Sequence, residues 1–172
     1  MKKIKLTESQ LHSIIKEAVT NVLKAQDYKN YVDSGKFYDG VAWVKNAKGK
    51  YNYIKPNDEL LSDVWFDEAY DFNDGCGVVK YKGKYNFVNT LGDLVSDKWF
   101  KDVNKFKNGF AAVMRNDGKW NFINSIGEII SKTWFDKCYY FEKDGGEVMI
   151  NGKIKYIDSN GKLLLQRKER GF

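Results

Sequence analysis

Few residues of this chain have the chemistry that catalysis requires. His12 is the only histidine among 172 residues, so Ser-His-Asp and Cys-His arrangements and most zinc sites are excluded. The remaining candidates are carboxylates, as in glycosidases, and the aspartates beside a repeated Trp-Phe pair are Asp63, Asp67, Asp97, Asp102 and Asp136. In neighbouring repeats Lys132 replaces the first of these and Lys101 the second, which is typical of solvent-facing positions. We therefore predict that the protein is not an enzyme and has no metal or cofactor site.

The glycines recur with a period of 34 or 35 residues, and none of them forms a GxGxxG or GxxxxGK[ST] phosphate loop. Three further landmarks keep the same period: a Trp-Phe pair, a single phenylalanine and a turn position. Self-similarity of this kind indicates an array of one small structural unit. The four sets are Gly49, Gly83, Gly118 and Gly152; Trp65-Phe66, Trp99-Phe100 and Trp134-Phe135; Phe37, Phe72, Phe106 and Phe141; and Asp58, Gly92, Gly127 and Gly161.

Each unit has the pattern of short β-strands joined by tight turns. In the third unit Trp120 and Phe122 alternate with Asn121, and this period of two is typical of a strand. Lys82-Gly83 and Asn151-Gly152 predict two-residue hairpin loops, since glycine and asparagine tolerate positive φ. The predicted fold is an all-β repeat array, a solenoid-like stack of β-hairpins with about three and a half repeats, preceded by one amphipathic α-helix.

The Trp-Phe pairs are predicted to form the core between repeats. A single hairpin buries only one side of its aromatic residues, and stacking of the next hairpin covers the other side. Full burial of one such ring is worth about 2 to 3 kcal/mol, so we assign these pairs to packing and not to binding. Cys138 stands where Ala69 and Val103 stand in other repeats, which predicts a small core residue.

The repeat resembles the WG repeat, also called the KWG repeat, over residues 37 to 165. The shared pattern is glycine, lysine, aromatic, asparagine and aromatic, followed by a glycine turn and Trp-Phe-Asp. The family usually has glycine after the first aromatic residue, where this chain has Asn52, Asn86, Asn121 and Lys155. Because asparagine adopts unusual backbone angles more readily than other side chains, this departure from the family pattern is mild, and geometry that depends on the glycine is not carried over to this chain. The resemblance implies no shared catalytic residues.

Residues 1–25 predict an amphipathic helix. Thr7-Glu8-Ser9-Gln10 has the form of a capping box, worth about 1 kcal/mol. An apolar stripe at helical spacing follows, and it needs a covering surface. Two alternatives stay open: the helix caps the first repeat, or it docks on another protein or on its own copy. The stripe consists of Leu11, Ile14, Ile15, Ala18, Val19, Val22 and Leu23.

Two observations favour docking of this helix. Residues 26–36 lack periodicity, which predicts a linker between the helix and a repeat domain at 37–172. The segment KIKLTESQLHSIIKEAV also resembles a leader found on otherwise unrelated proteins of tailed phages from gut anaerobes. This resemblance implies an address or adaptor in a phage-encoded setting, on a virion component or a host-interacting factor.

The composition limits the partners and the location. Twenty-nine Lys and Arg against 23 Asp and Glu give a net charge of +6 at pH 7, and the basic residues are spread over the hairpin turns, which disfavours nucleic acid. Cys76 and Cys138 lie outside any CxxC motif, which favours a reducing compartment. The start Met1-Lys2-Lys3 precedes an amphipathic pattern without an apolar run. We therefore expect no signal peptide, no membrane span and a cytoplasmic protein, or one carried inside a virion.

The functional prediction is a non-catalytic protein-binding or structural module whose protein partner meets the helix stripe. The alternative is a glycan or cell-wall binder that stacks sugars on Tyr51, Tyr53 and Tyr85. The segment Gly118 to Ile130 resembles a hairpin of the choline-binding or cell-wall-binding repeats, which favours stacked hairpins over a closed propeller. A glycan binder should expose its rings in grooves between units, whereas a scaffold should bury them.

Overall fold

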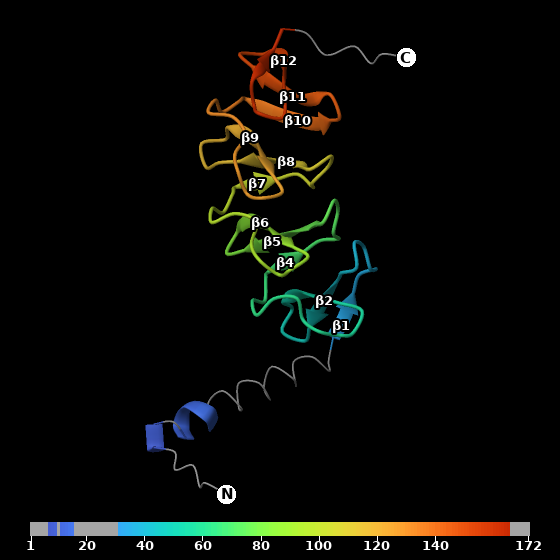
Figure 1. The fold of residues 1–172 in the computed structure, drawn as a ribbon, viewed down its shortest axis with the longest axis vertical. Coiled ribbons are helices and arrows are strands. Elements are labelled where there is room, and N and C mark those ends of the chain that lie inside the picture. The colour runs from blue at the N-terminus through green and yellow to red at the C-terminus, as the bar shows by residue number, and fades with distance from the viewer. Residues whose placement is uncertain (1–6, 10, 16–30, 166–172) are drawn as a thin grey trace, which may run out of the picture.

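The computed structural model describes residues 7–9, 11–15 and 31–165 (Figure 1). Residues 31–165 form four small antiparallel sheets, which follow one another along a column with the first and fourth sheets at opposite ends. The strands are β1 (Tyr31–Ser34), β2 (Ala42–Asn46) and β3 (Tyr51–Ile54); β4 (Glu68–Ala69), β5 (Cys76–Tyr81) and β6 (Lys84–Asn89); β7 (Asp102–Val103), β8 (Phe110–Met114) and β9 (Trp120–Asn124); and β10 (Lys137–Glu142), β11 (Gly145–Ile150), β12 (Lys153–Ile157) and β13 (Leu163–Leu164).

The four sheets share one construction. A two-stranded hairpin forms the centre, and the strand before it pairs with its first strand. The chain then returns along the second hairpin strand through single bridges, such as Tyr51 to Phe66 and Ile54 to Leu60 in the first sheet. In the fourth sheet this return is the strand β13. The prediction of a mostly β, repeat-like protein is thus confirmed.

The predicted linker at 26–36 contains a strand. Tyr31–Ser34 pairs with β2 through a register shift and occupies the place that β4, β7 and β10 hold in the other sheets. The segment lacks a period of two because a strand of four residues with an irregular register buries too few side chains to need one.

The predicted hairpin turns are present. Lys82 and Gly83 have φ of 49° and 77°, and Asn151 and Gly152 have 50° and 73°. Two positive φ values in a row match the twist of the flanking strands. The opposite end of each hairpin carries a second series of turns, in which the carboxylate of Asp39 accepts from the Gly75 amide at 2.9 Å and that of Asp74 accepts from Gly109 at 2.6 Å. These bonds join consecutive sheets at one edge of the column.

Three of the four buried clusters fill the spaces between consecutive sheets, so each of the two inner sheets supplies a wall to two cores. The fourth cluster, of Ala42, Val44 and Ile54, belongs to the first sheet. Phe66, Phe100 and Phe135 are 1 to 3% exposed, as predicted for the second member of each pair. The tryptophans differ from that prediction, because Trp65, Trp99 and Trp134 are only partly buried at the rims of the clusters. An indole at the rim keeps part of its surface in water while covering the apolar core beneath it. The clusters centre on Tyr53 and Phe72, on Phe87 and Phe106, and on Phe122 and Phe141.

The asparagines that replace the family's glycine are buried supports. Asn86 is fully buried and does not have a positive φ. Its amide donates to the carbonyl of Ser96 at 2.7 Å and its oxygen accepts from the Phe87 amide. Asn52 and Asn121 make the same contacts with Ser62 and Ser131. The side chain therefore ties the hairpin to its returning segment.

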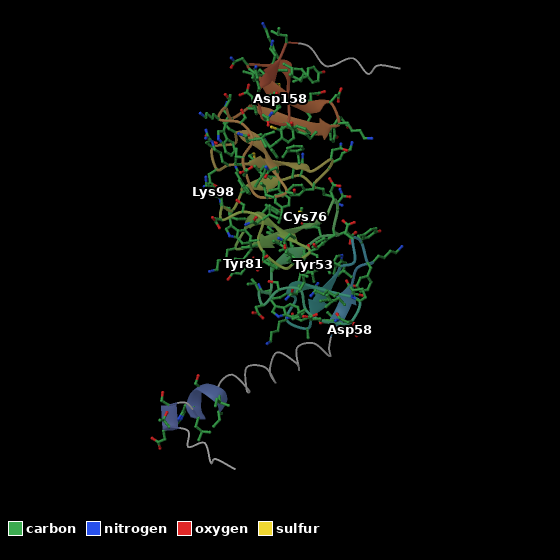
Figure 2. The ribbon with its side chains drawn as sticks, in the orientation of Figure 1. Tyr53, Asp58, Cys76, Tyr81, Lys98 and Asp158 are labelled. Carbon is green, nitrogen blue, oxygen red and sulfur yellow. The ribbon has the colours of Figure 1, made fainter. Side chains whose placement is uncertain are left out.

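The turn glycines mark close approaches between sheets. Gly92 has φ of 93°, and a Cβ there would collide with the carbonyl oxygen of Leu61 in the preceding sheet. Gly127 and Gly161 meet the carbonyls of Val95 and Ile130 in the same way. Asp58 holds this position in the first unit, with φ of 61°, at the end of the column (Figure 2).

The N-terminal helix is present only in part within the described residues. Residues 8–9 and 11–15 are helical, and the amide of Leu11 donates to the Thr7 carbonyl at 3.0 Å. The capping contact of Gln10 and the stripe residues Ala18, Val19, Val22 and Leu23 lie outside the described residues. Among the described residues, no helix has both the length and the hydropathy to cross a membrane.

Candidate binding surfaces

The described part of the helix presents the predicted apolar face to solvent. Leu11, Ile14 and Ile15 are 47, 48 and 51% exposed. Their spacing of three and four residues puts them on one side of the helix, so they form a short, half-exposed apolar strip. The intramolecular cap and the docking element therefore remain alternatives that differ in what covers these three side chains.

Two of the three predicted tyrosines line grooves between adjacent sheets. The first groove, between the first and second sheets, has a volume of about 330 Å³, and the second, between the second and third, of about 230 Å³. They share Tyr70 and Lys105 and therefore adjoin. The first is lined by Trp43, Tyr51, Glu68, Ala69, Tyr70, Asp71 and Lys105, and the second by Tyr70, Val78, Tyr85, Asp102, Val103 and Lys105.

In the first groove two rings are fixed by polar contacts. The indole of Trp43 donates to Asp71 at 2.9 Å, and its ring lies 5.7 Å from that of Tyr51. The Lys45 ammonium lies 5.3 Å from the centre of the Tyr51 ring, a distance within reach of a cation–π interaction. Two aromatic surfaces and a carboxylate thus stand at one interface between sheets.

A network of polar contacts joins residues of the two grooves, since Glu68 lines the first, Tyr85 the second and Tyr70 both. The Lys80 ammonium lies 2.8 Å from Glu68 and 5.3 Å from the centre of the Tyr85 ring. Lys80, and after it the Tyr70 hydroxyl, lowers the pKa of Glu68 below its usual value. The same carboxylate, by accepting from Tyr70, raises the pKa of that phenol to about 12. At neutral pH Tyr70, which lines both grooves, is therefore a neutral phenol beside a closed ion pair.

Tyr53 was predicted as a glycan-stacking residue, and this prediction is wrong. Its ring is fully buried inside the column (Figure 2), at 4.8 Å and nearly perpendicular to Phe72. Its hydroxyl donates to the carbonyl of Tyr70 at 2.7 Å and lies 3.0 Å from that of Val78. Burial raises the pKa of Tyr53 far above that of a free phenol. The hydroxyl thus satisfies backbone carbonyls at a position where the second and third sheets have Phe87 and Phe122.

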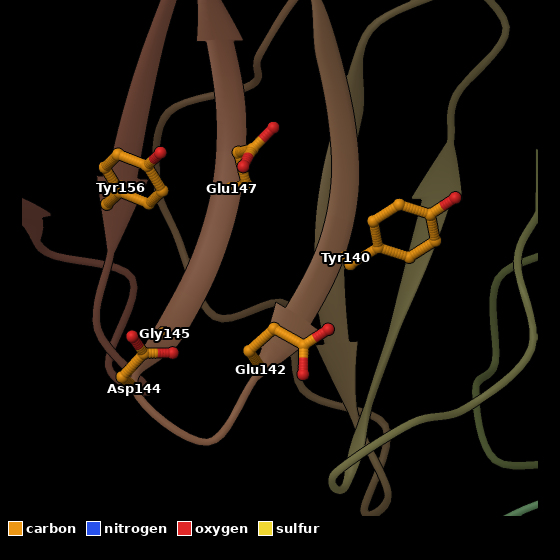
Figure 3. Close-up of a pocket in the computed structure, with 6 residues that line it drawn as sticks. All are labelled: Tyr140, Glu142, Asp144, Gly145, Glu147 and Tyr156. Carbon is orange, nitrogen blue, oxygen red and sulfur yellow. The ribbon is translucent and has the colours of Figure 1, made fainter. Parts of the chain in front are cut away.

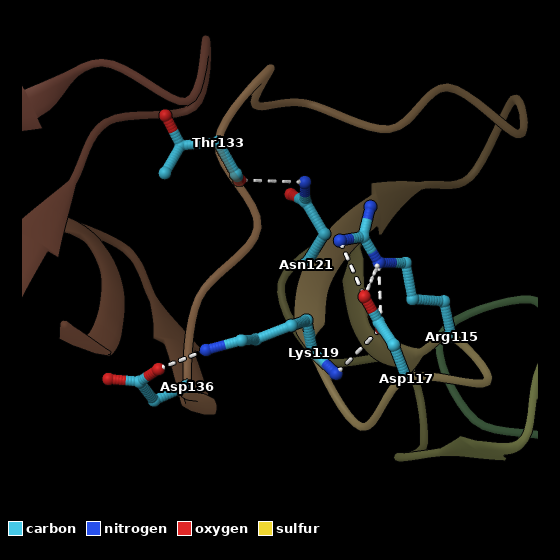
Figure 4. A network of polar contacts seen from close by, with 6 residues as sticks. All are labelled: Arg115, Asp117, Lys119, Asn121, Thr133 and Asp136. Carbon is cyan, nitrogen blue, oxygen red and sulfur yellow. Dashed lines mark hydrogen bonds and ion pairs between the residues drawn. The ribbon is translucent and has the colours of Figure 1, made fainter. Parts of the chain in front are cut away.

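The recurring aspartates bind lysines and turns. Asp136 lies 2.6 Å from the Lys119 ammonium (Figure 4) and accepts from the Asn151 amide at 2.6 Å. Asp67 makes the equivalent contacts with Lys50 and with the Lys82 amide. These ion pairs lower the pKa of both carboxyls. Asn121 in the same view donates to the Thr133 carbonyl, and no cluster of three metal-ligating side chains occurs within the described residues.

Both cysteines are buried and unpaired. Burial, with smaller effects from Asp74 and Asp39, raises the pKa of Cys76 to about 11, and burial also raises the pKa of Cys138. Cys138 pairs with Val148 across the sheet, as Ala69 does with Val79, so its predicted place in the core is confirmed. Protonated buried thiols are poor nucleophiles.

Sequence reasoning missed the groove residues Trp43 and Tyr70. Tyr70 is 39% exposed and lies two residues before Phe72, at a repeat position that holds Gly35, Asn104 and Tyr139 in the other units. A search confined to the hairpin motif does not reach it. The signal that was available is an aromatic residue two places before the periodic phenylalanine.

These contacts define a class of protein: an array of small antiparallel sheets with buried interfaces and shallow aromatic grooves between them. Residues 53–85 and 87–120 each match the family model described as the WG containing repeat. The earlier resemblance is therefore supported over two consecutive repeats at the centre of the column. No curated protein matches the chain.

Several solved structures are similar to the chain. Kluyveromyces lactis Hsv2 is 12% identical, with a TM-score of 0.47 over 78% of this chain and 50% of that one. The computationally designed Ika8 protein is 16% identical, with 0.41 over 75% and 46%. The WD40 beta propeller domain of Doa1 is 11% identical, with 0.35 over 74% and 50%. The chain spans about half the length of these structures.

Proposed function

We propose that the chain is a non-catalytic module that binds another protein through its N-terminal helix and uses the solenoid-like column as a structural body. The observation that carries this proposal is the exposed strip of Leu11, Ile14 and Ile15, each about half exposed. An amphipathic helix binds by laying such a face into an apolar groove. Three buried cores between consecutive sheets hold the column together.

The proposal extends to the setting of the protein. The leader resemblance alone supports a phage-encoded virion component or host-interacting factor, and the interior of the producing cell or of the particle as its location. The partner is another protein or a second copy of the helix.

The test is capture of partners by the full chain and by a variant with Ile15 and Val22 both replaced by aspartate. The expected result is loss of the proteins that the wild type captures from the native host or particle, with the thermal midpoint unchanged. Ile126→Asp is the matched control, because Ile126 is an apolar side chain with 75% exposure on a turn of the column, and it should capture the same proteins. A thermal midpoint several degrees lower in the helix variant would make the helix an intramolecular cap and reject the proposal.

A second candidate function is glycan binding in the grooves, favoured by Tyr51 and Tyr85 beside the carboxylates Glu68, Asp71 and Asp102. Aromatic faces flanked by hydrogen-bonding groups are a common composition of ligand sites. Calorimetry with soluble cell-wall fragments tests it. Tyr85→Ala should abolish the heat of binding and Tyr85→Phe should keep most of it, since the ring face is retained. Equal heats for the wild type and Tyr85→Ala would reject this function.

A further inference from the structure

One aromatic contact recurs at all three interfaces of the column. A phenylalanine of the later sheet packs edge-on against an aromatic ring of the sheet before it. The ring centres are 4.8 Å apart for Tyr53 and Phe72, 4.7 Å for Phe87 and Phe106, and 5.1 Å for Phe122 and Phe141. We call this phenylalanine the plug and the surface that receives it the socket.

The third sheet shows the lining of a socket around its plug, Phe141, whose ring also stacks on Phe110 at 3.9 Å. The lining residues of the third unit are Asn104, Lys105, Phe106, Lys107, Phe110, Ala112 and Phe122. Five of these positions, those of Lys105, Lys107, Phe110, Ala112 and Phe122, correspond 34 or 35 residues further along the chain to Tyr140, Glu142, Gly145, Glu147 and Tyr156. These five residues, with Asp144, line a pocket of about 170 Å³ on the fourth sheet (Figure 3).

This pocket is therefore a fourth socket, built from β10, β11 and β12. Phe141 points into the third interface. Its neighbours Tyr140 and Glu142 line the pocket on the fourth sheet and also reach Lys107 of the third unit, whose ammonium lies 2.8 Å from Glu142 and 5.8 Å from the centre of the Tyr140 ring. Within residues 31–165 no fifth sheet supplies a plug. A cavity of about 150 Å³ is large enough for a benzene ring, so the pocket has room for one phenylalanine side chain.

The opposite end of the column carries a plug. Phe37 is the first member of the phenylalanine series, yet it is 49% exposed, and its neighbour Tyr38 is 45% exposed. Phe72, Phe106 and Phe141 are 1 to 4% exposed. Phe37 belongs to the first sheet, and within residues 31–165 no sheet precedes it. The outer-face residues Ala42, Val44 and Ile54 are nevertheless buried, so the exposed apolar surface at this end is that of Phe37 and Tyr38.

The two ends are complementary in charge and in hydrogen bonding. The fourth socket has Glu147 where the third has Ala112, and Lys36 directly precedes the Phe37 plug. Tyr156 also stands at the position of Tyr53, whose hydroxyl donates to the carbonyl two residues before its plug. The carbonyl two residues before Phe37 belongs to Gly35.

We propose that the chain assembles head to tail, with Phe37 of one copy inserted between Tyr140, Glu147 and Tyr156 of the next. The junction lies at the exposed edge of the first sheet, with Lys36 facing Glu147 and the Tyr156 hydroxyl donating to Gly35. It joins two different surfaces and leaves one plug and one socket free at the ends. A contact of this type adds further copies in a line and does not close as a two-fold dimer.

Sedimentation velocity of the full chain over a concentration series tests the proposal. The mean mass of the wild type should rise with concentration, and added salt should reduce the rise because charges face each other across the junction. Phe37→Ala, Glu147→Lys and Lys36→Glu should each weaken association about tenfold or more, the loss typical of a central interface residue. Ile126→Ala removes an exposed apolar side chain from a turn and should behave as the wild type.

Mixing two of the defective variants tests the polarity of the junction. Phe37→Ala retains the socket and Glu147→Lys retains the plug, so an equimolar mixture should form a dimer with one junction and nothing larger. Circular dichroism melting of each variant identifies any loss of fold, and Glu147→Gln replaces Glu147→Lys if that variant fails this check. A wild type that stays monomeric at every concentration, or a mixture that stays monomeric, would overturn the proposal. Undiminished association of both variants would also overturn it and would assign self-association to the N-terminal helix.

Discussion

The inner and terminal units of this array carry different residues at equivalent positions, and each difference follows the neighbour that is present or missing. Phe72, Phe106 and Phe141 have a preceding sheet and are buried, whereas Phe37 has none in the column and is half exposed. Asp58 stands where Gly92 stands because only the later position faces a carbonyl of a preceding sheet. A departure from the repeat is thus evidence about packing at that place.

The other end of the chain shows the same relation. Asn52, Asn86 and Asn121 are buried and donate to the returning segment of their own unit. The fourth unit has Lys155 at this position, and its side chain is exposed. In the first three units the acceptor is the backbone carbonyl of Ser62, Ser96 or Ser131 in the returning segment. The fourth unit, whose return is β13, has Leu165 at this position.

The largest difference between inner and terminal units is expected for the phenylalanines. Phe106→Ala should lower the free energy of unfolding by about 3 to 5 kcal/mol, because it leaves a cavity between two sheets. Phe37→Ala should change it by about 0.5 kcal/mol or less in the monomer. Urea unfolding at low protein concentration measures both, and equal losses would contradict the assignment of Phe37 to a free end.

The turn position offers a reciprocal exchange. Gly92→Asp puts a side chain against the Leu61 carbonyl, and overpacking of this kind costs about 1 to 3 kcal/mol. Asp58→Gly should cost about 0.5 kcal/mol or less, since glycine adopts the positive φ freely. Thermal melts of the two variants distinguish them. If Asp58→Gly were the more damaging change, close approach would not be the reason for glycine in the later units.

The asparagine support should cost somewhat less to remove. Asn86→Ala leaves the Ser96 carbonyl and the Phe87 amide without this partner, and a buried polar group without a partner costs about 1 to 3 kcal/mol. Lys155→Ala, at the exposed terminal equivalent, should be nearly neutral. Hydrogen exchange of the Phe87 amide provides a local readout, and unchanged protection in Asn86→Ala would reject the proposed support.

The smallest effect is expected at the ion pairs that join the hairpins, which the second unit lacks because Lys101 replaces the aspartate. Lys50, and after it the Lys82 amide, lowers the pKa of Asp67. The stabilisation is therefore fully present above the unfolded pKa of about 4 and is lost as pH falls through the lower folded pKa. Melting curves of the wild type and Asp67→Asn should differ at neutral pH and converge in acid. A difference independent of pH would exclude the ion pair as its source.

Most of the fold could be predicted from the sequence, because the period, the two-residue turns and the burial of one phenylalanine per pair follow from local patterns. The role of Asn86 could not, since its partner Ser96 is brought close only by the returning segment. The strand Tyr31–Ser34 could not either, because pairing with β2 and not its own composition makes it a strand.

The candidate site was predicted less well, because exposure depends on the stacking of sheets. Tyr51 and Tyr53 lie two residues apart on one strand, yet Tyr51 lines a groove and Tyr53 lies at the centre of a core. Alternation gives both side chains the same face, and only the position of the next sheet separates their surroundings. Tyr70, which lines both grooves, could not be predicted because its position in the repeat has no fixed residue type.

The glycine turns also set a dimension of the molecule. Gly92, Gly127 and Gly161 lie against backbone carbonyls of the preceding sheet, so main chain, whose size does not vary with sequence, determines how closely consecutive units approach. Packed sheets lie about 10 Å apart. The spacing between consecutive sheets is therefore the same along the column. Gain or loss of one repeat would change the length of the column by one such spacing and leave the distance between the remaining grooves unaltered.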